Sequence, residues 1–317
     1  MIKFIEDLQE PDVSRIWLSQ ISVVDHAYID DKGCVRGGSF NPNFIVSGTP
    51  DPVEKVVVDF STVKKDIKKI IDKHEDNAIK NGFDHKLWVI EGYSNVQVFD
   101  ITSKGTVIIQ TPAIKIELPL NAVRYIQRID FLEPSHHLDY IGVAFANHVQ
   151  EGMEKIYPNI QVDVQCINTV DEHISLNART RPFHYVHGLK DSTSYGCQNI
   201  AHGHRSFIHV DNDNDPACFH ELMAVASVLD DTVFVREDNV VQNGANTITL
   251  GYTTSQRGKF SMSLNTDAHK VVVLPTETTV EFLAAYIKQY YGGKLKAYGA
   301  NAVYVSEGLS KGAVEKL

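Results

Sequence analysis

The sequence after Asp59 has the spacing of an amphipathic helix. Its apolar residues recur at i, i+4, i+7 and i+8, so they share one helical face, while lysines take the outer positions. These apolar residues are Val63, Ile67, Ile70 and Ile71. The helix is predicted to end near residues 81–82, where an Asn-Gly pair interrupts the pattern.

The rest of the first half predicts strands and then a second helix. Short segments of β-forming residues at 96–99, 106–109 and 114–118 indicate strands. A helix capped by residues 134–135 follows, and a strand at 160–164 closes this half. Strands and helices in separate runs favour an α+β fold with antiparallel sheets.

The second half repeats this order. One helix begins at 215–216, with a proline where the missing N–H costs nothing, and another begins at Thr279 and is predicted to end at 292–293. The predicted strands lie at 247–250, 260–264, 271–274 and 302–305. The repeated order predicts a tandem duplication with domains 1–178 and 179–317. The alternative is one large α+β domain whose halves resemble each other by coincidence.

Composition limits the class of protein. A length of 317 residues suits two domains, and 43% hydrophobic with 22% charged residues is typical of a globular chain. No apolar run is long enough to span a bilayer, the N-terminal residues lack the apolar core of a secretion signal, and four scattered cysteines predict no disulfide framework. We therefore expect a cytoplasmic protein. The net charge of −10 argues against nucleic-acid binding, although not against a small anionic substrate.

A histidine cluster near the start of the second half carries the strongest chemical signal. His202 and His204 are two residues apart, so on a strand both rings leave the same face. His187, on a preceding strand, completes a set of three, and Cys197 lies nearby. Neutral imidazoles around a cation with an open position are typical of catalytic zinc. Taken alone, the His-X-His pair also fits two surface histidines.

This pattern resembles the family of 6-pyruvoyltetrahydropterin and 6-carboxytetrahydropterin synthases, which have the tunnelling fold. The resemblance covers residues 180–317 and extends more weakly to 15–170. The matching residues are Phe183, His187, Leu189, Cys197, His202, His204, Thr279, Glu281 and Glu307. The resemblance implies two tandem units, each an antiparallel four-stranded sheet with two helices on one face. It also implies a homo-oligomer, such as a trimer of tandem chains.

The resemblance also implies the chemistry. His187, His202 and His204 would bind Zn²⁺, and Cys197 would be the general base acting on dihydroneopterin triphosphate. Glu307 would hold the pterin ring through two N–H bonds, with Thr279 and Glu281 at the start of the neighbouring helix. The activity would be that of a carbon–oxygen lyase of tetrahydrobiopterin or queuosine biosynthesis, with carbon–carbon cleavage as a variant. The alternatives are a buried structural thiol for Cys197 and a solvated carboxylate for Glu307.

The two halves depart from the family pattern in complementary ways. The family's Asp-His pair is Asp84-His85 in the first half, whereas residues 230–231 are both aspartates. Counting from Cys34 at family spacing places residues 40–44 at the metal motif and Cys166 at the pterin-binding Glu, so of the ligand set only His26 remains. We therefore expect one composite site per pair of chains, formed where a first unit meets a second, and an inactive site at the reciprocal junction. The alternatives are a catalytically impaired pterin-binding protein and a related purine enzyme.

A long insertion precedes the second helix of each half, between residues 85 and 135 and between 231 and 279. Both insertions contain β-forming segments, so each unit is expected to carry an added hairpin or small sheet. For a triphosphate, the candidate contacts are Lys86, Arg181, Lys190 and Arg205.

Overall fold

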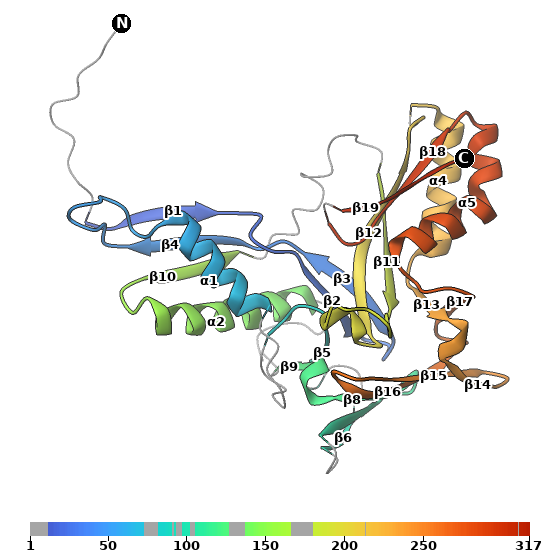
Figure 1. The fold of residues 1–317 in the computed structure, drawn as a ribbon, viewed down its shortest axis with the longest axis horizontal. Helices are drawn as coiled ribbons and strands as arrows, with labels where there is room; N and C mark the ends of the chain where they lie inside the picture. Colours follow the sequence, from blue (N-terminus) through green and yellow to red (C-terminus); the bar gives the residue numbers. More distant parts are fainter. Residues whose placement is uncertain are drawn as a thin grey trace, which may run out of the picture.

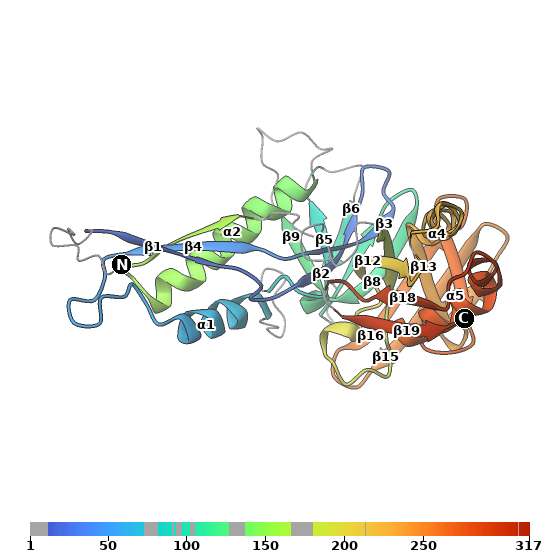
Figure 2. The same ribbon diagram turned by 90° about the horizontal axis from the view of Figure 1, so that it is seen from above.

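The computed structural model is a mixed α+β protein (Figures 1 and 2). It describes residues 12–72, 82–90, 92, 97–101, 105–126, 137–165, 180–212, 214–309 and 311–317. Within these ranges there are four α-helices and four sheets. None of the described helices is both long and apolar enough to cross a membrane. Residue 81 of the expected helix end, the cap at 134–135, Cys166 and the boundary between residues 178 and 179 lie outside the described residues.

The described part of the first half contains ten strands and two α-helices. In chain order they are β1 (Ser14–Leu18), β2 (Val24–Ile29), β3 (Val35–Phe40), β4 (Asn43–Gly48), α1 (Phe60–Asp72), β5 (Lys86–Ile90), β6 (Gln97–Ile101), β7 (Thr106–Gln110), β8 (Ile114–Pro119), β9 (Val123–Ile126), α2 (His137–Ile156) and β10 (Gln161–Gln165). The predicted α1 face is confirmed in the main, because Val63, Ile67 and Ile71 are buried.

Among its described residues, the second half contains nine strands and two α-helices. In chain order they are β11 (Arg181–His187), β12 (His202–Val210), α4 (Pro216–Leu229), β13 (Thr232–Arg236), β14 (Val240–Asn243), β15 (Thr247–Thr254), β16 (Gly258–Asn265), β17 (Lys270–Leu274), α5 (Val280–Ala297), β18 (Ala302–Ser306) and β19 (Gly312–Lys316). The Asp215 side chain caps α4 by accepting bonds from the N–H groups of Ala217 and Cys218, at 2.8 and 3.0 Å.

Strands of the two halves pair in the same order. The second half forms the sheet β17-β13-β11-β12-β18-β19. The first half forms β9-β5-β2-β3, and β4, which follows β3 after two residues, pairs with β10 as β12 pairs with β18. The prediction of antiparallel sheets is wrong in part, because β5 runs parallel to β2 and β9, and β13 runs parallel to β11 and β17. A helical crossover between β3 and β5, and between β12 and β13, permits parallel pairing.

The two insertions share one sheet. Strands β6, β7 and β8 continue into β16, β15 and β14, with Ile116 opposite Met262 at the junction. The expected hairpin or small sheet in each unit is therefore half of a six-stranded sheet. Pairing β8 with β16 removes two exposed edges, and its inward residues join a core with side chains of both halves. The buried residues at this junction are Ile114, Ile116, Met262 and Leu264.

Helix α5 does not end at residues 292–293 as predicted. It continues to Ala297 because Leu295 is buried in the second-half core, and Gly299, at φ 88°, follows the C-cap. Gly292 lies where the chain end packs, since a Cβ there would come within 3.0 Å of a Leu317 methyl.

The hairpins β2–β3 and β11–β12 contact each other (Figure 1), and the helices pack on the sheets away from this contact. One apolar core lies between the first-half strands and α1 and α2, and another between the second-half strands and α4 and α5. Where β3 crosses β12, a Cβ built on Gly203 would lie 2.5 Å from the Cα of Gly37. Glycine at both positions allows this backbone contact, which brings the two hairpins together at the candidate site.

Candidate active site

Three histidines converge on one point. His187 ends β11, His202 begins β12 directly opposite it, and His204 follows on the same face. Their Nε2 atoms lie 3.0 to 3.1 Å from one another, and all three residues are fully buried. The predicted convergence of these residues is present in the structure.

The outer nitrogen of two rings has an acceptor beside it. His187 Nδ1 lies 2.7 Å from the carbonyl oxygen of Thr278, which fixes a proton on Nδ1 and leaves a lone pair on Nε2. His204 Nδ1 lies 3.2 Å from the Asp25 carboxylate, which favours the same tautomer. Burial, and then the neighbouring histidines, hold the pKa of His187 and of His202 well below the ordinary value. The His187 and His202 rings are therefore neutral at neutral pH.

This geometry fits a metal ligand set. A neutral Nε2 atom either donates or accepts, so three of them facing one another cannot all be paired by hydrogen bonds. A cation at the centre would use all three lone pairs, and imidazole nitrogens about 3 Å apart suit a zinc ion at about 2.0–2.1 Å. The donor set of His187, His202 and His204 thus fits Zn²⁺.

Sequence reasoning missed Asp25. This carboxylate is 3% exposed, accepts a hydrogen bond from the Ser39 hydroxyl and lies beside His204. Burial opposes its ionisation, but the charge and hydrogen bond of His204 hold its pKa below the ordinary value. A carboxylate behind a ligand histidine fixes the ring and raises its basicity. The only sequence signal was its position next to His26, which carries no chemistry by itself.

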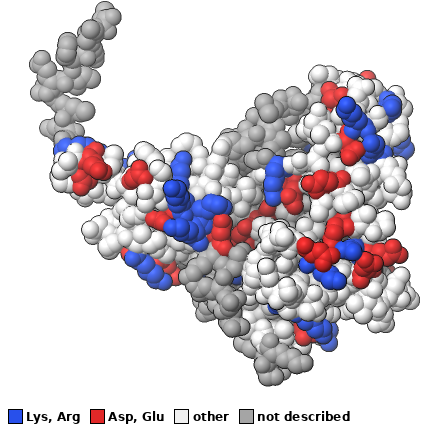
Figure 3. Space-filling view, in the orientation of Figure 1, with Lys and Arg blue, Asp and Glu red and all other residues white. Residues whose placement is uncertain are grey.

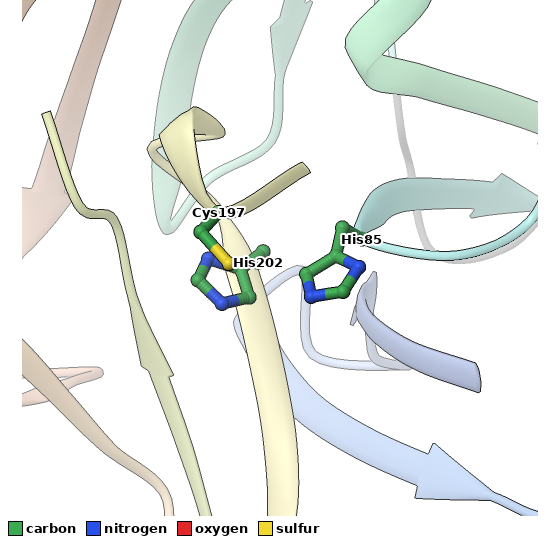
Figure 4. A group of neighbouring side chains, drawn as sticks. All are labelled: His85, Cys197 and His202. Carbon is green, nitrogen blue, oxygen red and sulfur yellow. The ribbon is translucent and has the colours of Figure 1, made fainter. Parts of the chain in front are cut away.

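The Asp-His pair of the first half meets the cysteine of the second within one chain. His85 Nδ1 lies 2.6 Å from Asp84 Oδ2, and a hydrogen bond joins the His85 imidazole to the Cys197 thiol. The ligand atoms of His85, Cys197 and His202 all lie within 4.8 Å of one another. Figure 4 shows the His85 ring facing Cys197 and His202.

The electrostatics of this pair favour charge separation. Burial by itself lowers the pKa of His85, but the Asp84 carboxylate raises it well above the ordinary value. Burial by itself raises the pKa of Cys197, but the hydrogen bond from His85 lowers it below the ordinary value. Asp84 is in turn oriented by the backbone N–H of Asp25, at 2.9 Å. A thiol with a lowered pKa beside an imidazole is suited to proton transfer.

A cavity of about 530 Å³ opens beside His85. It lies between the first half and the β18–β19 turn of the second. Its lining includes Ser22, Asp25, Asn41, Lys68, Asp84, His85, Leu309 and Lys311. Lys and Arg side chains gather over α1, the helix that carries Lys68 (Figure 3). The cavity is therefore lined by carboxylate and imidazole groups, from Asp25, Asp84 and His85, and by the amines of Lys68 and Lys311.

Of the predicted substrate-binding residues, Glu307 lies near Cys197, whereas Thr279 and Glu281 lie at the start of α5. Glu307 forms an ion pair with Lys311, at 2.9 Å, and is close enough to oppose the lowering of the Cys197 pKa. Thr279 is the N-cap residue of α5 without a side-chain cap bond, and Glu281 is exposed in the first turn. The neighbouring Thr278 is the residue that contacts His187.

Among the candidate phosphate contacts, Lys86 is excluded because it is fully buried. The guanidinium of Arg181 lies over the Phe219 ring at 4.1 Å, and that of Arg205 lies over Phe207 at 5.7 Å. Lys190 is half-buried. None of these four lines the cavity described above.

Strand register corrects the counterparts of the metal ligands. His187, His202 and His204 correspond to Tyr28, Arg36 and Gly38 in the first hairpin, because each triplet holds the same places in its ladder. The expected counterpart at residues 40–44 is wrong, and so is the assignment of His26, which corresponds to Tyr185. The loop between β2 and β3 is much shorter than the one between β11 and β12, so counting from Cys34 shifted the alignment.

No protein-family profile and no curated protein sequence matches this chain. Among solved structures, it is similar to a catalytic-residue mutant of 6-pyruvoyltetrahydropterin synthase from Plasmodium vivax. The TM-score is 0.36 and the identity 16%, over 49% of this chain and 92% of that one. The Plasmodium falciparum enzyme has a TM-score of 0.33 and 16% identity, over 50% of this chain and 100% of that one. A likeness this distant assigns no activity.

Proposed function

We propose that this chain is a zinc-dependent lyase acting on a pterin such as dihydroneopterin triphosphate. Its site would be built by two tandem tunnelling-fold units, at 1–178 and 179–317, within one chain. The proposal depends most on one observation: His85 of the first half lies against Cys197 of the second, beside His202. The shared order of strand pairing in the two halves supports a duplication.

The metal would be held by His187, His202 and His204, where a zinc ion supplies Lewis acidity toward the hydroxyls of the substrate side chain. Thr278 and Asp25 hold two of these rings in the ligating tautomer. The ligand rings are buried, which keeps water away from all but the open side of the site.

The proton would move between the two halves. The Cys197 thiolate takes a proton from the side-chain carbon, and the electron pair left behind expels the triphosphate with cleavage of one carbon–oxygen bond. His85 returns a proton through the same hydrogen bond, and Asp84 stabilises its charged form. These roles follow from the opposite directions of the two pKa shifts.

The cavity beside His85 has room for a pterin and part of its side chain. Lys68 and Lys311 are the amines that would face an anionic group there. Glu307 would have to exchange its ion pair with Lys311 for the N–H groups of the ring. The family resemblance also implies a homo-oligomer, for which a trimer of tandem chains supplies six units.

The test is substitution of His85 to alanine with a matched control. In His85→Ala, turnover of dihydroneopterin triphosphate should fall by about 10²-fold or more, the usual contribution of a positioned acid–base group. Zinc should stay at one equivalent per chain. Asp231→Asn, at the corresponding position of the second half, should retain turnover. Zinc binding without turnover in the wild type would instead favour the catalytically impaired binding protein, and a purine product would favour the related purine enzyme.

A further inference from the structure

Arg257 is a buried cation at the turn between β15 and β16. The residue is 6% exposed, and burial lowers the pKa of its guanidinium to about 10. Among the residues that the structure describes, its partners are uncharged. The guanidinium donates to the carbonyls of Tyr195 and Gly196, at 3.0 and 3.4 Å, and to the Asn121 amide oxygen, at 3.3 Å.

A guanidinium buried without a carboxylate is costly. Desolvation opposes its charge, and an apolar side chain of similar size would fill the space without that cost. The Tyr195 ring, 4.6 Å from the guanidinium carbon, offsets part of it by a cation–π contact. What the arginine adds is a fixed planar group whose Nη1 donates to two successive main-chain carbonyls while its Nη2 donates to Asn121.

The carbonyls that Arg257 holds belong to the two residues before Cys197. Gly196 lies on His85 so closely that an added Cβ would come within 2.7 Å of the His85 Cβ. Asn199, on the other side of Cys197, donates to the main-chain carbonyls of His85 and Ala122, both at 3.0 Å. The loop that carries Cys197 is thus pressed onto His85 at both ends.

The shared inserted sheet supplies most of this support. Gln256, next to Arg257, accepts a bond from the Gln198 amide at 3.1 Å, and the Tyr252 hydroxyl donates to the Gln198 carbonyl at 3.0 Å. Asn121 follows β8 of the first-half insertion and donates to the Tyr195 hydroxyl. Both insertions therefore hold the same loop.

We infer that Arg257, at the end of the inserted sheet, is a positioning residue that holds the Cys197 loop against His85. The inference rests on the proposed function, because that function gives the Cys197–His85 contact its role in proton transfer. It does not depend on which substrate is used, because the contact itself can be measured.

The experiment is a double-mutant cycle on the zinc-loaded protein, with iodoacetamide alkylation of Cys197 followed by peptide mass spectrometry. In the protein that retains Arg257, His85→Ala should slow the alkylation of Cys197 by about tenfold, because the imidazole no longer favours the thiolate. In the Arg257→Met background the same change should alter the rate by less than about twofold, because the loop has left His85. Arg257→Lys should restore part of the coupling. Lys259→Met, an exposed change in the same hairpin, should leave it unchanged.

An undiminished effect of His85→Ala in the Arg257→Met background would overturn the inference. If that variant does not fold, Asn121→Ala, which removes one partner of the guanidinium, must reduce the coupling by itself, and unchanged coupling there would be equally decisive. Because no substrate is needed, the coupling can be lost as expected even if no pterin is turned over. That result would reject the proposed function and retain the role of Arg257.

Discussion

The same backbone frame carries two different side-chain pairs at the two junctions between the halves. Strand register makes Arg36 the counterpart of His202, and the parallel strand starts make Asp231 the counterpart of His85. His85 and Asp231 even share a left-handed backbone, at φ 55° and 59°. At one junction the His85 and His202 rings lie 5.2 Å apart. At the other, the Arg36 guanidinium lies 3.3 Å from the Asp231 carboxylate.

The difference shows that two junctions of similar backbone structure can carry side chains suited to different roles. Arg36 also bonds Asp30, at 2.7 Å, so a fixed positive charge stands where the other junction has the His202 ring. A guanidinium cannot ligate a cation and repels one. Gly38 takes the place of His204 because the His26 ring fills the space a side chain would need. One junction is therefore suited to catalysis, and the other to holding the halves together.

Removing a metal ligand should have the largest effect. His202→Ala should release the zinc and reduce turnover by more than about a thousandfold, because the Lewis acid is lost. Arg36→Met, at the corresponding position of the other junction, should retain zinc at the wild-type level. Metal analysis and a pterin turnover assay measure both. Equal zinc loss in the two variants would show that the junctions do not differ as described.

The carboxylate behind His204 should have the next largest effect. Asp25→Asn should weaken zinc binding by about 10–100-fold, the usual consequence of losing a group that orients a ligand. His184 holds the corresponding place in the second half, so His184→Asn is the matched control and should leave zinc affinity unchanged. Competition with a chelator measures both affinities. Unchanged affinity in Asp25→Asn would remove this residue from the site.

The glycine contact between the hairpins should affect stability. Gly37→Ala places a Cβ against the Tyr185 carbonyl, and we expect a loss of about 1–3 kcal/mol in the free energy of unfolding. Gly293→Ala is the control, because its Cβ would meet nothing within 4 Å in a helix and should stabilise by about 0.5–1 kcal/mol. Denaturant unfolding gives both values. If Gly37→Ala were neutral, the hairpins would not be in contact there.

The ion pair of the other junction should have the smallest effect. Arg36→Met removes the bonds to Asp30 and Asp231 and should cost about 1–2 kcal/mol of stability, since both are partly shielded from water. Turnover per folded chain should not change. Thermal unfolding and kcat together decide, and a fall in kcat would mean that this junction also contributes to the reaction.

Local signals in the sequence predicted the elements and the three histidines that converge, but not the long-range pairing. The helical spacing of Val63, Ile67 and Ile71, and the alternation of His202 and His204, depend only on nearby residues. The parallel pairing of β5 and β13, and the junction of β8 with β16, depend on distant strands that leave no local pattern.

That Asp84-His85 of the first half meets Cys197 of the second was predicted from complementary losses, whereas the groups that support this contact were not. Asp25, Thr278 and Arg257 act through contacts that cross the fold, so their residue types alone carried no signal. The counterpart of the metal motif was misplaced because a short loop in the first hairpin shifted the count. Loop length is set by the turn, not by the residues that the strands present.

The central claim is that His85 and Cys197 of the same chain form one site, and subunit complementation tests it most directly. The His85→Ala and Cys197→Ala variants are each expected to be inactive. The two are purified separately, mixed, unfolded together, refolded with zinc and assayed for pterin turnover. The account predicts that the mixture stays as inactive as either variant, because every chain lacks one member of its own pair. Recovery of a substantial fraction of wild-type turnover in the mixture would contradict it, because the pair would then come from different chains.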